Sequence, residues 1–190
     1  MKLIARLTAA TAILATTTLS AETAPNPNAE EAKGIIKEFA TTLQGELQAA
    51  IKEGGPTNAI AVCQDRAPAI AADLSERSGW EVGRTSLKTR NTADNAPDAW
   101  EQKVLADFDA RRAAGEDVQP MGYAEVVETA DGKTFRFMKA IPTGEVCLAC
   151  HGTDMTPEVA AAIDERYPDD MARGYGLGDV RGAFSLSKPL

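Results

Sequence analysis

The sequence predicts an α+β domain in which helices flank an antiparallel sheet. Apolar residues repeat with helical spacing in the first half of the chain, whereas the clearest strand signals lie in the second half. Asp131 and Gly132 separate two of these strand segments, and an Asp-Gly pair supplies the positive φ angles of a tight hairpin turn. Early helices followed by hairpin-linked strands are typical of the α+β class.

The N-terminal segment has the features of an export signal. A positively charged start precedes an uncharged stretch over residues 7–19, and small residues follow around Ala21. We therefore expect residues 1–21 to be a cleaved signal peptide, 22–28 a tether, and 29–190 a single domain in the periplasm. An uncleaved membrane anchor is the alternative, although the apolar run is short and rich in Thr for a bilayer span. No later segment is apolar enough to cross a membrane.

The overall charge argues against a nucleic-acid partner. The 190-residue chain has a formal net charge of −8, and removal of the signal peptide makes the remainder more acidic. An acidic protein is repelled by a phosphate backbone. Nucleic-acid binding is therefore not expected.

The first predicted helix begins at Asn28, because Glu31 follows three residues later in the pattern of a capping box. Its apolar stripe comprises Ile35, Ile36, Phe39, Leu43, Leu47 and Ile51. Gly54 and Gly55 are expected to end it.

A second helix is predicted to start at Pro56 or Thr57. Its apolar stripe comprises Ile60, Cys63, Ala67 and Ile70. Pro68 must either kink this helix or begin a new one, since the proline ring clashes with the preceding helical turn.

The remaining expected elements alternate between strands, loops and helices. They are a weak strand over residues 80–89, a turn-rich loop over 90–97, a helix from Pro97 or Asp98 to Ala114, strands over 123–129 and 134–141, and a last strand over 180–187. Between the last two strands, Thr156 and Pro157 are expected to start a short helix that runs to about Arg166.

The stretch CLACHG contains the strongest chemical signal in the chain. It brings together Cys147, Cys150 and His151, which is the only histidine. A Cys-x-x-Cys-His motif is typical of c-type haem attachment, in which two sulfurs form thioethers and the histidine binds the iron. Two residues between the sulfurs suit one helical turn against the porphyrin edge. We therefore expect one covalent haem c, with His151 as an iron ligand.

Two other chemistries compete with haem attachment at these residues. A zinc site could combine the three residues of the motif with Cys63, but adjacent residues rarely converge on one tetrahedral ion. A redox dithiol needs no following histidine and usually lies at the start of a helix in an α/β unit. The haem accounts for all three residues of the motif and leaves only Cys63 as a free thiol.

The sixth iron ligand cannot be a second histidine, because none exists. Cys63 lies on the apolar stripe of its helix, and iron coordination would protect a lone thiol in an oxidising compartment. A small buried hydrophobic residue is the alternative role for it. Water, Lys, Tyr, an empty position or one of the methionines Met121, Met138 and Met171 remains open, whereas Met155 is expected on the His151 side.

Five stretches resemble a known family. They are AVCQDRAPAIA (61–71), GRTSLKTRN (83–91), APDAWE (96–101), CLACHG (147–152) and YPDDMARGYGLGDVRGAFSLS (167–187). In this order they are similar to the PAS-like c-type haem family, formerly catalogued as a domain of unknown function. Its members occur as exported single domains and as the sensing part of histidine kinases and chemotaxis-type receptors.

The resemblance implies a PAS-like antiparallel sheet with flanking N-terminal helices and a covalent c-type haem. It implies His151 as the proximal ligand and Cys63 on the other side of the iron. The sequence departs from the family at its usual Arg-Asn-Pro turn, where Thr92 follows Arg90 and Asn91. The role of that turn in the family therefore does not transfer to this chain.

Three basic residues are candidates for binding the haem propionates. They are Arg84, Lys88 and Arg90, and arginine forms bidentate pairs with carboxylates. The alternative is that they form a solvated, charge-balancing face. The aromatic residues Tyr123, Phe135, Phe137 and Tyr175 either line the haem pocket or belong to the ordinary core.

Two classes of function follow from these expectations. A redox- or gas-responsive sensor would lose the Cys63 ligand on reduction and admit a diatomic gas, and it would need a separate signalling partner. A soluble electron-transfer cytochrome would keep both ligands and would need a redox partner. A peroxidase-like enzyme is the third option, but the chain has no second histidine for acid–base catalysis, so no catalytic residue is assigned.

Overall fold

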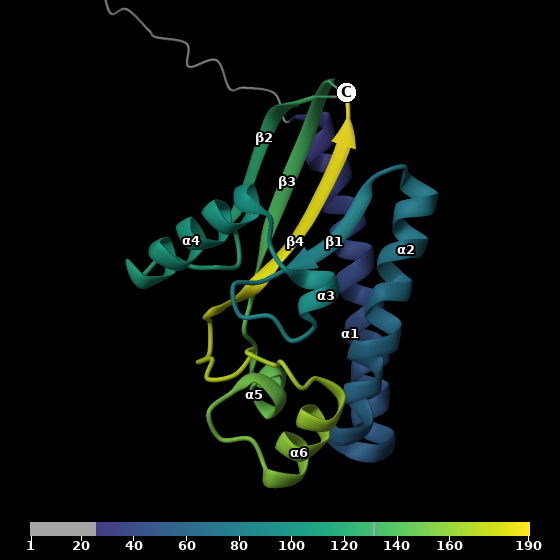
Figure 1. Ribbon diagram of the computed structural model, residues 1–190, viewed down its shortest axis with the longest axis vertical. Coiled ribbons are helices and arrows are strands. Elements are labelled where there is room, and N and C mark those ends of the chain that lie inside the picture. Colours follow the sequence, from purple (N-terminus) through teal and green to yellow (C-terminus); the bar gives the residue numbers. More distant parts are fainter. Residues whose placement is uncertain (1–25, 131) are drawn as a thin grey trace, which may run out of the picture.

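Helices cover both faces of a four-stranded antiparallel sheet. The computed structural model describes residues 26–130 and 132–190. In Figure 1, α1 and α2 run side by side against one face of the sheet, and α4 crosses the other. The short helices α5 and α6 lie beyond one end of the sheet, beside the lower part of α1. The predicted signal peptide and the part of the tether before residue 26 lie outside the described residues, as does Asp131.

The elements follow the predicted order along the chain. The helices are α1 (Pro27–Ala61), η1 (Val62–Arg66), α2 (Ala67–Ser78), α3 (Thr92–Asn95), α4 (Ala99–Ala113), α5 (Glu145–His151) and α6 (Pro157–Arg166). The strands are β1 (Glu81–Thr85), β2 (Gly122–Thr129), β3 (Gly132–Pro142) and β4 (Val180–Pro189).

The strand order is β1-β4-β3-β2, and all neighbours are antiparallel. The hairpin of β2 and β3 pairs Gly122 with Lys139 at one end and Thr129 with Gly132 at the other. The predicted hairpin is confirmed, but β3 begins two residues earlier than predicted, at Gly132. The last strand, β4, lies between β1 and β3. The prediction of an antiparallel α+β fold is therefore confirmed.

Alternation along the strands divides the core into two clusters. Because successive side chains point to opposite faces, neighbours such as Phe137 and Met138 belong to different clusters. The α1 side contains Ile35, Ile36, Phe39, Ile70, Leu74, Trp80, Val82, Phe135, Phe137, Phe184 and Leu186. The α4 side contains Val104, Leu105, Phe108, Val118, Met121, Met138, Ala140, Val180 and Ala183.

A third, smaller cluster attaches α6 to the end of α1. Its buried members are Ile60, Val159, Ile163 and Tyr167, and Cys150 and Met155 pack against it while partly buried. The region around α5 is therefore held against the N-terminal helices by its own apolar contacts.

The start of α1 differs from the sequence prediction. Asn26 caps the helix, because its side-chain oxygen accepts hydrogen bonds from the backbone N–H groups of Asn28 and Ala29. Pro27 follows in the first helical position, where proline loses no hydrogen bond. The predicted capping box of Asn28 with Glu31 is wrong, and the last residues of the predicted tether belong to the helix.

The middle of the N-terminal half agrees with the proline and glycine signals. Gly54 and Gly55 have non-helical backbone angles and kink α1, and Pro68 lies in the first turn of α2. The strand predicted over residues 80–89 is shorter, since β1 ends at Thr85. The predicted loop over residues 90–97 contains the single helical turn α3.

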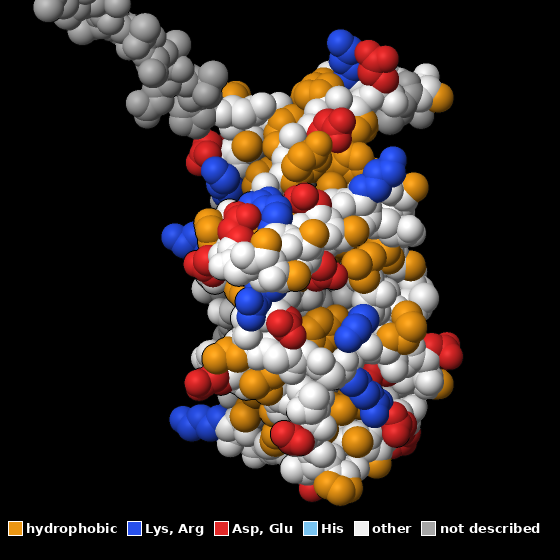
Figure 2. Space-filling model, turned by 90° about the vertical axis from the view of Figure 1, so that its left-hand side faces the viewer, with side chains coloured by type: hydrophobic (Ala, Val, Ile, Leu, Met, Phe, Trp, Pro, Cys, Tyr) orange, Lys and Arg blue, Asp and Glu red, His pale blue; other side chains and the backbone are white. Residues whose placement is uncertain are grey.

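The surface carries charges of both signs. On the face shown in Figure 2, Lys and Arg side chains alternate with Asp and Glu down the molecule, and hydrophobic atoms gather toward the upper end. Among the described residues, none of the helices combines the length and apolar character needed to cross a bilayer.

Gly182 is required where β4 passes β1. A Cβ atom at this position would lie 2.4 Å from the Thr85 carbonyl oxygen, and its φ of +157° also disfavours other residues. Gly182→Ala is therefore expected to lower the free energy of unfolding by about 2 kcal/mol or more. Gly34→Ala is the matched control, because nothing lies within 4 Å of its Cβ and the helix gains about 0.5–1 kcal/mol. Equal urea midpoints for the two variants would contradict this packing.

Candidate functional site

The Cys-x-x-Cys-His motif forms the short helix α5. It follows the end of β3, with Gly144 at its N-cap position. Cys147, Cys150 and His151 share one side of the helix, because residues three and four apart are neighbours on a helical surface. All three cysteines of the chain are free and half-buried. The predicted helical turn between the two sulfurs is therefore confirmed.

Gly152 ends this helix at a close backbone contact. Its N–H donates to the carbonyl of Leu148 at 3.0 Å, and a Cβ at this position would lie 2.6 Å from the same oxygen. A glycine directly after His151 therefore lets the chain turn away without displacing the motif.

The His151 imidazole is oriented by a backbone carbonyl. Its Nδ1 lies 2.7 Å from the Ala172 oxygen, and because a carbonyl can only accept, Nδ1 carries the proton in this contact. Burial lowers the pKa of His151 to about 2, and the positive charges of Arg181 and Arg90 act in the same direction. The ring is therefore neutral, with its Nε2 lone pair available to a metal ion.

A buried ion pair holds the carbonyl groups around His151. The Arg90 Nε donates to the Asp170 Oδ1 at 3.0 Å, and the two side chains are only 8% and 1% exposed. The Arg90 Nη2 also donates to the Cys150 carbonyl at 2.6 Å and to the Ala172 carbonyl at 3.3 Å. Asp170 accepts from the Ala172 N–H at 3.0 Å. One arginine thus connects the last turn of α5 to the segment that orients the histidine.

Cys63 lies in η1, a π-helical turn between α1 and α2. Such turns are rare and occur frequently at functional sites. Cys63 is half-buried and close enough to Cys150, Arg84 and Tyr167 to influence the pKa of each. Ile60, three residues earlier, packs in the same cluster as Cys150. The fold therefore brings Cys63 to the region of α5, although 84 positions separate Cys63 from Cys147 in the numbering.

The methionines are distributed differently. Met121 and Met138 are fully buried in the α4-side cluster, on the face of the sheet opposite α1. Met155 is partly buried and packs against the cluster between α6 and the end of α1, as Cys150 does. Met171 is 54% exposed. The structure thus places two of the three open methionine candidates in the ordinary core.

The predicted basic residues have different surroundings. Arg90 is engaged by Asp170 and by backbone carbonyls, as described above. The Arg84 guanidinium lies 5.4 Å from the centre of the Phe39 ring, and burial lowers its pKa. Lys88 is exposed, with its Nζ 5.1 Å from the centre of the Tyr175 ring.

Arg181 is a site residue that the sequence analysis missed. It is half-buried at the start of β4, with its Nε 3.2 Å from the His151 Nδ1 and its Nη1 3.2 Å from the Ser86 Oγ. Burial lowers its pKa. The only sequence signal for it is a charged residue among the apolar and small residues at the start of β4.

Of the aromatic candidates, only Tyr175 contacts the motif. Its ring packs edge-on against His151, with the ring centres 6.2 Å apart. Phe135 and Phe137 belong to the α1-side core, and Tyr123 is exposed beside Trp100. The structure therefore favours ordinary core packing for Phe135 and Phe137, and it places Tyr123 on the surface.

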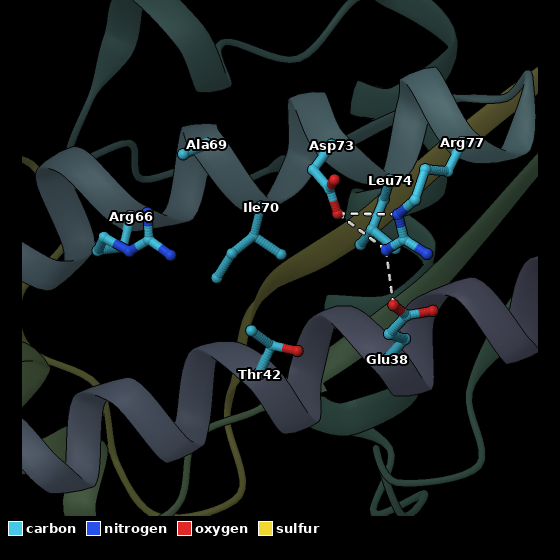
Figure 3. Close-up of a pocket in the computed structure, with 8 residues that line it drawn as sticks. All are labelled: Glu38, Thr42, Arg66, Ala69, Ile70, Asp73, Leu74 and Arg77. Carbon is cyan, nitrogen blue, oxygen red and sulfur yellow. Dashed lines mark hydrogen bonds and ion pairs between the residues drawn. The ribbon is translucent and has the colours of Figure 1, made fainter.

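Two cavities lie outside the motif. One of about 300 Å³ lies between α1 and α2 and is lined by both charged and uncharged side chains, with Arg77 bridging Asp73 and Glu38 (Figure 3). The other, of about 570 Å³, lies between α4 and the loops that carry Lys88 and Tyr175. Neither is lined by a cysteine or by His151.

The donor set fits a covalently bound haem. The two sulfurs are free and share a helical side with a neutral imidazole whose Nδ1 is already engaged. The thiol of Cys63 lies near this helix. Half-buried guanidinium groups at Arg84 and Arg181 offer positive charge for carboxylates. Among the described residues, no three His, Cys, Asp or Glu side chains form a cluster that could hold a metal ion on its own.

Comparisons with known proteins identify one family and one solved structure. Residues 8–189 match the model of the Tll0287-like family. The structure matches the crystal structure of the cyanobacterial heme-protein Tll0287 with a TM-score of 0.65 and 25% sequence identity. The match covers 87% of this chain and 97% of that protein. No curated protein matches the chain.

Replacing Asp170, the acidic residue of the buried ion pair, is expected to lower the free energy of unfolding. Asp170→Asn leaves the Arg90 charge buried without a counter-ion, which typically lowers the free energy of unfolding by about 3–5 kcal/mol. Asp73→Asn is the control, because it removes the same charge from an exposed arginine pair and costs at most about 1 kcal/mol. Urea unfolding of both variants measures the difference, and equal losses would contradict a special role for Asp170.

The same substitution is expected to change the response to acid. Burial raises the pKa of Asp170, but hydrogen bonds from Arg90 and Arg173 outweigh it and hold the pKa below its ordinary value of 3.8. A depressed pKa contributes stability that is present above the unfolded value of about 3.9 and is lost as pH falls through the folded value. The stability gap between the wild-type protein and Asp170→Asn should therefore narrow below about pH 4. A gap of constant size down to pH 3 would refute this assignment.

Proposed function

The chain belongs to the Tll0287-like family, and on this premise we propose that it is an exported haem c protein that acts as a redox- or gas-responsive sensor. Cys147 and Cys150 bind the haem covalently, and His151 and Cys63 are its iron ligands. The observation that carries the proposal is the orientation of His151. This residue lies on the same helix as both sulfurs, and the Ala172 carbonyl holds its Nδ1.

The haem assignment has support from the motif and from the relative. Tll0287 is described as a heme-protein, and the structural match covers nearly all of it. When bound, the haem supplies a one-electron redox centre and, once a ligand leaves, an open coordination position for a diatomic gas.

The protein holds His151 and Cys63 by different means, which supports a ligand switch at Cys63. The imidazole is fixed by Ala172, and Ala172 is fixed in turn by Arg90 and Asp170. Cys63 lies in a π-helical turn between two longer helices, which is a less regular element than the helices beside it. We propose that if the bound iron received one electron from an external donor, Cys63 would take up a proton from solvent and dissociate as a neutral thiol, whereas His151 would remain a ligand. Such a change has to be read by a separate signalling partner.

The ferric ligand is tested by electron paramagnetic resonance. Cys63→Ala is expected to abolish the low-spin thiolate signal of the oxidised protein, because the sulfur ligand is gone. Met155→Leu is the matched control, since it removes the sulfur of a residue that packs against the same apolar cluster as Cys150 and should leave the signal intact. An unchanged low-spin signal in Cys63→Ala would rule out the thiolate.

Carbon monoxide separates the sensor from an electron-transfer cytochrome. If Cys63 leaves on reduction, the reduced wild-type protein should bind carbon monoxide as readily as reduced Cys63→Ala, and absorption spectroscopy measures this. A carrier that keeps both ligands would show no spectral change in the wild-type protein. That outcome would replace the sensor proposal with electron transfer to a redox partner.

A further inference from the structure

Two half-buried arginines near the motif have no acidic partner. Among the described residues, every other buried or half-buried arginine forms an ion pair with a carboxylate, whereas Arg84 and Arg181 form none. The Arg84 guanidinium has no hydrogen-bond acceptor among those residues either, and it lies against the Phe39 ring. A guanidinium taken partly out of water without an anion is costly, so this arrangement indicates a missing negative group.

The contact between Arg181 and His151 strengthens this argument. An imidazole that binds iron through Nε2 carries its proton on Nδ1 and donates it to Ala172. The Arg181 Nε lies 3.2 Å from the same Nδ1, so two N–H donors would then face each other. The other acceptors of Arg181 are the Ser86 hydroxyl at 3.2 Å and the Lys88 carbonyl at 3.5 Å. With the iron bound, Arg181 therefore needs a further acceptor.

The two arginines lie near different candidate iron ligands. Arg181 contacts the ring of His151, whereas Arg84 lies near Cys63 and Tyr167 on the α1 side of the sheet. Haem c carries two propionate groups, and a guanidinium pairs bidentately with a carboxylate. The two positive charges thus equal the two propionates in number and are opposite to them in sign.

We infer that Arg181 binds a haem propionate from the His151 side, and that Arg84 binds the other from the Cys63 side. This inference rests on the proposed haem but not on which group is the sixth ligand. It distinguishes Arg181 from Arg90, whose donors are already occupied by Asp170, Cys150 and Ala172. Lys88, which is exposed, is not required for this pairing.

The experiment uses the haem-loaded protein and the variant Arg181→Gln. Resonance Raman spectroscopy of the propionate bending band reports hydrogen bonding to the propionate directly, and the band should shift in the variant. The midpoint potential should fall, because a lost positive charge favours the more positive ferric state. An unpaired propionate should also make the potential of the variant decrease as pH rises through the propionate pKa, in addition to the pH dependence that proton uptake by Cys63 gives the wild-type protein.

Arg77→Gln is the matched control. It removes one guanidinium charge from an exposed pair on α2 and should change neither the band nor the pH dependence of the potential. Arg181→Lys keeps the charge but cannot form a bidentate hydrogen bond. In this variant the propionate bending band should shift, whereas the midpoint potential should stay close to that of the wild-type protein. If Arg181→Gln does not retain haem, the propionate bending band is measured in Arg181→Lys and in Arg84→Gln instead.

An unchanged propionate band in Arg181→Gln or Arg181→Lys overturns the inference, even if the potential falls. Arg181 would then act on the iron through His151 rather than through the propionate. Carbon monoxide binding is measured on the same samples and reports the sensor proposal separately, because the propionate band exists whether or not Cys63 is a ligand.

Discussion

The ion pair between Arg90 and Asp170 is the interaction on which the rest of the site depends. It joins residues 80 positions apart and is almost fully buried. Through it, the guanidinium holds the carbonyls of Cys150 and Ala172, and Ala172 in turn orients His151. A buried charge pair is weak evidence for net stability, but it has one favourable geometry, so it positions the groups bonded to it. Protein contacts alone therefore hold the histidine ring in one orientation.

The fold brings Cys63 and the helix that carries His151 into one region from distant parts of the chain. His151 follows β3 on the short helix α5, whereas Cys63 lies between α1 and α2, which pack on one face of the sheet. The apolar cluster between α6 and the end of α1 includes Cys150 among its partly buried members. The core thus fixes the relative positions of His151, which is held by hydrogen bonds, and Cys63, which lies in an irregular turn. This difference is the physical basis of the proposed switch.

Local signals in the sequence predicted most of the helices and strands and the motif. The Asp-Gly turn predicted the hairpin, Thr156 with Pro157 predicted α6, and the motif spacing predicted the turn of α5. The start of α1 was misplaced because Asn26 and Asn28 both suit a cap, and Pro27 decides between them. The engagement of Arg90 by Asp170 and the approach of Arg181 to His151 depend on tertiary contacts over 80 and 30 positions. No local pattern encodes such contacts.

Mass spectrometry of protein matured in a host that assembles c-type cytochromes tests the central claim most directly. After treatment with a thiol-alkylating reagent and trypsin, the fragment from Ala140 to Arg166 contains Cys147 and Cys150. The account predicts that this fragment carries the mass of one haem and no alkyl group, and that Cys63 alone is alkylated. A fragment that lacks the haem mass and is alkylated at both cysteines would contradict it.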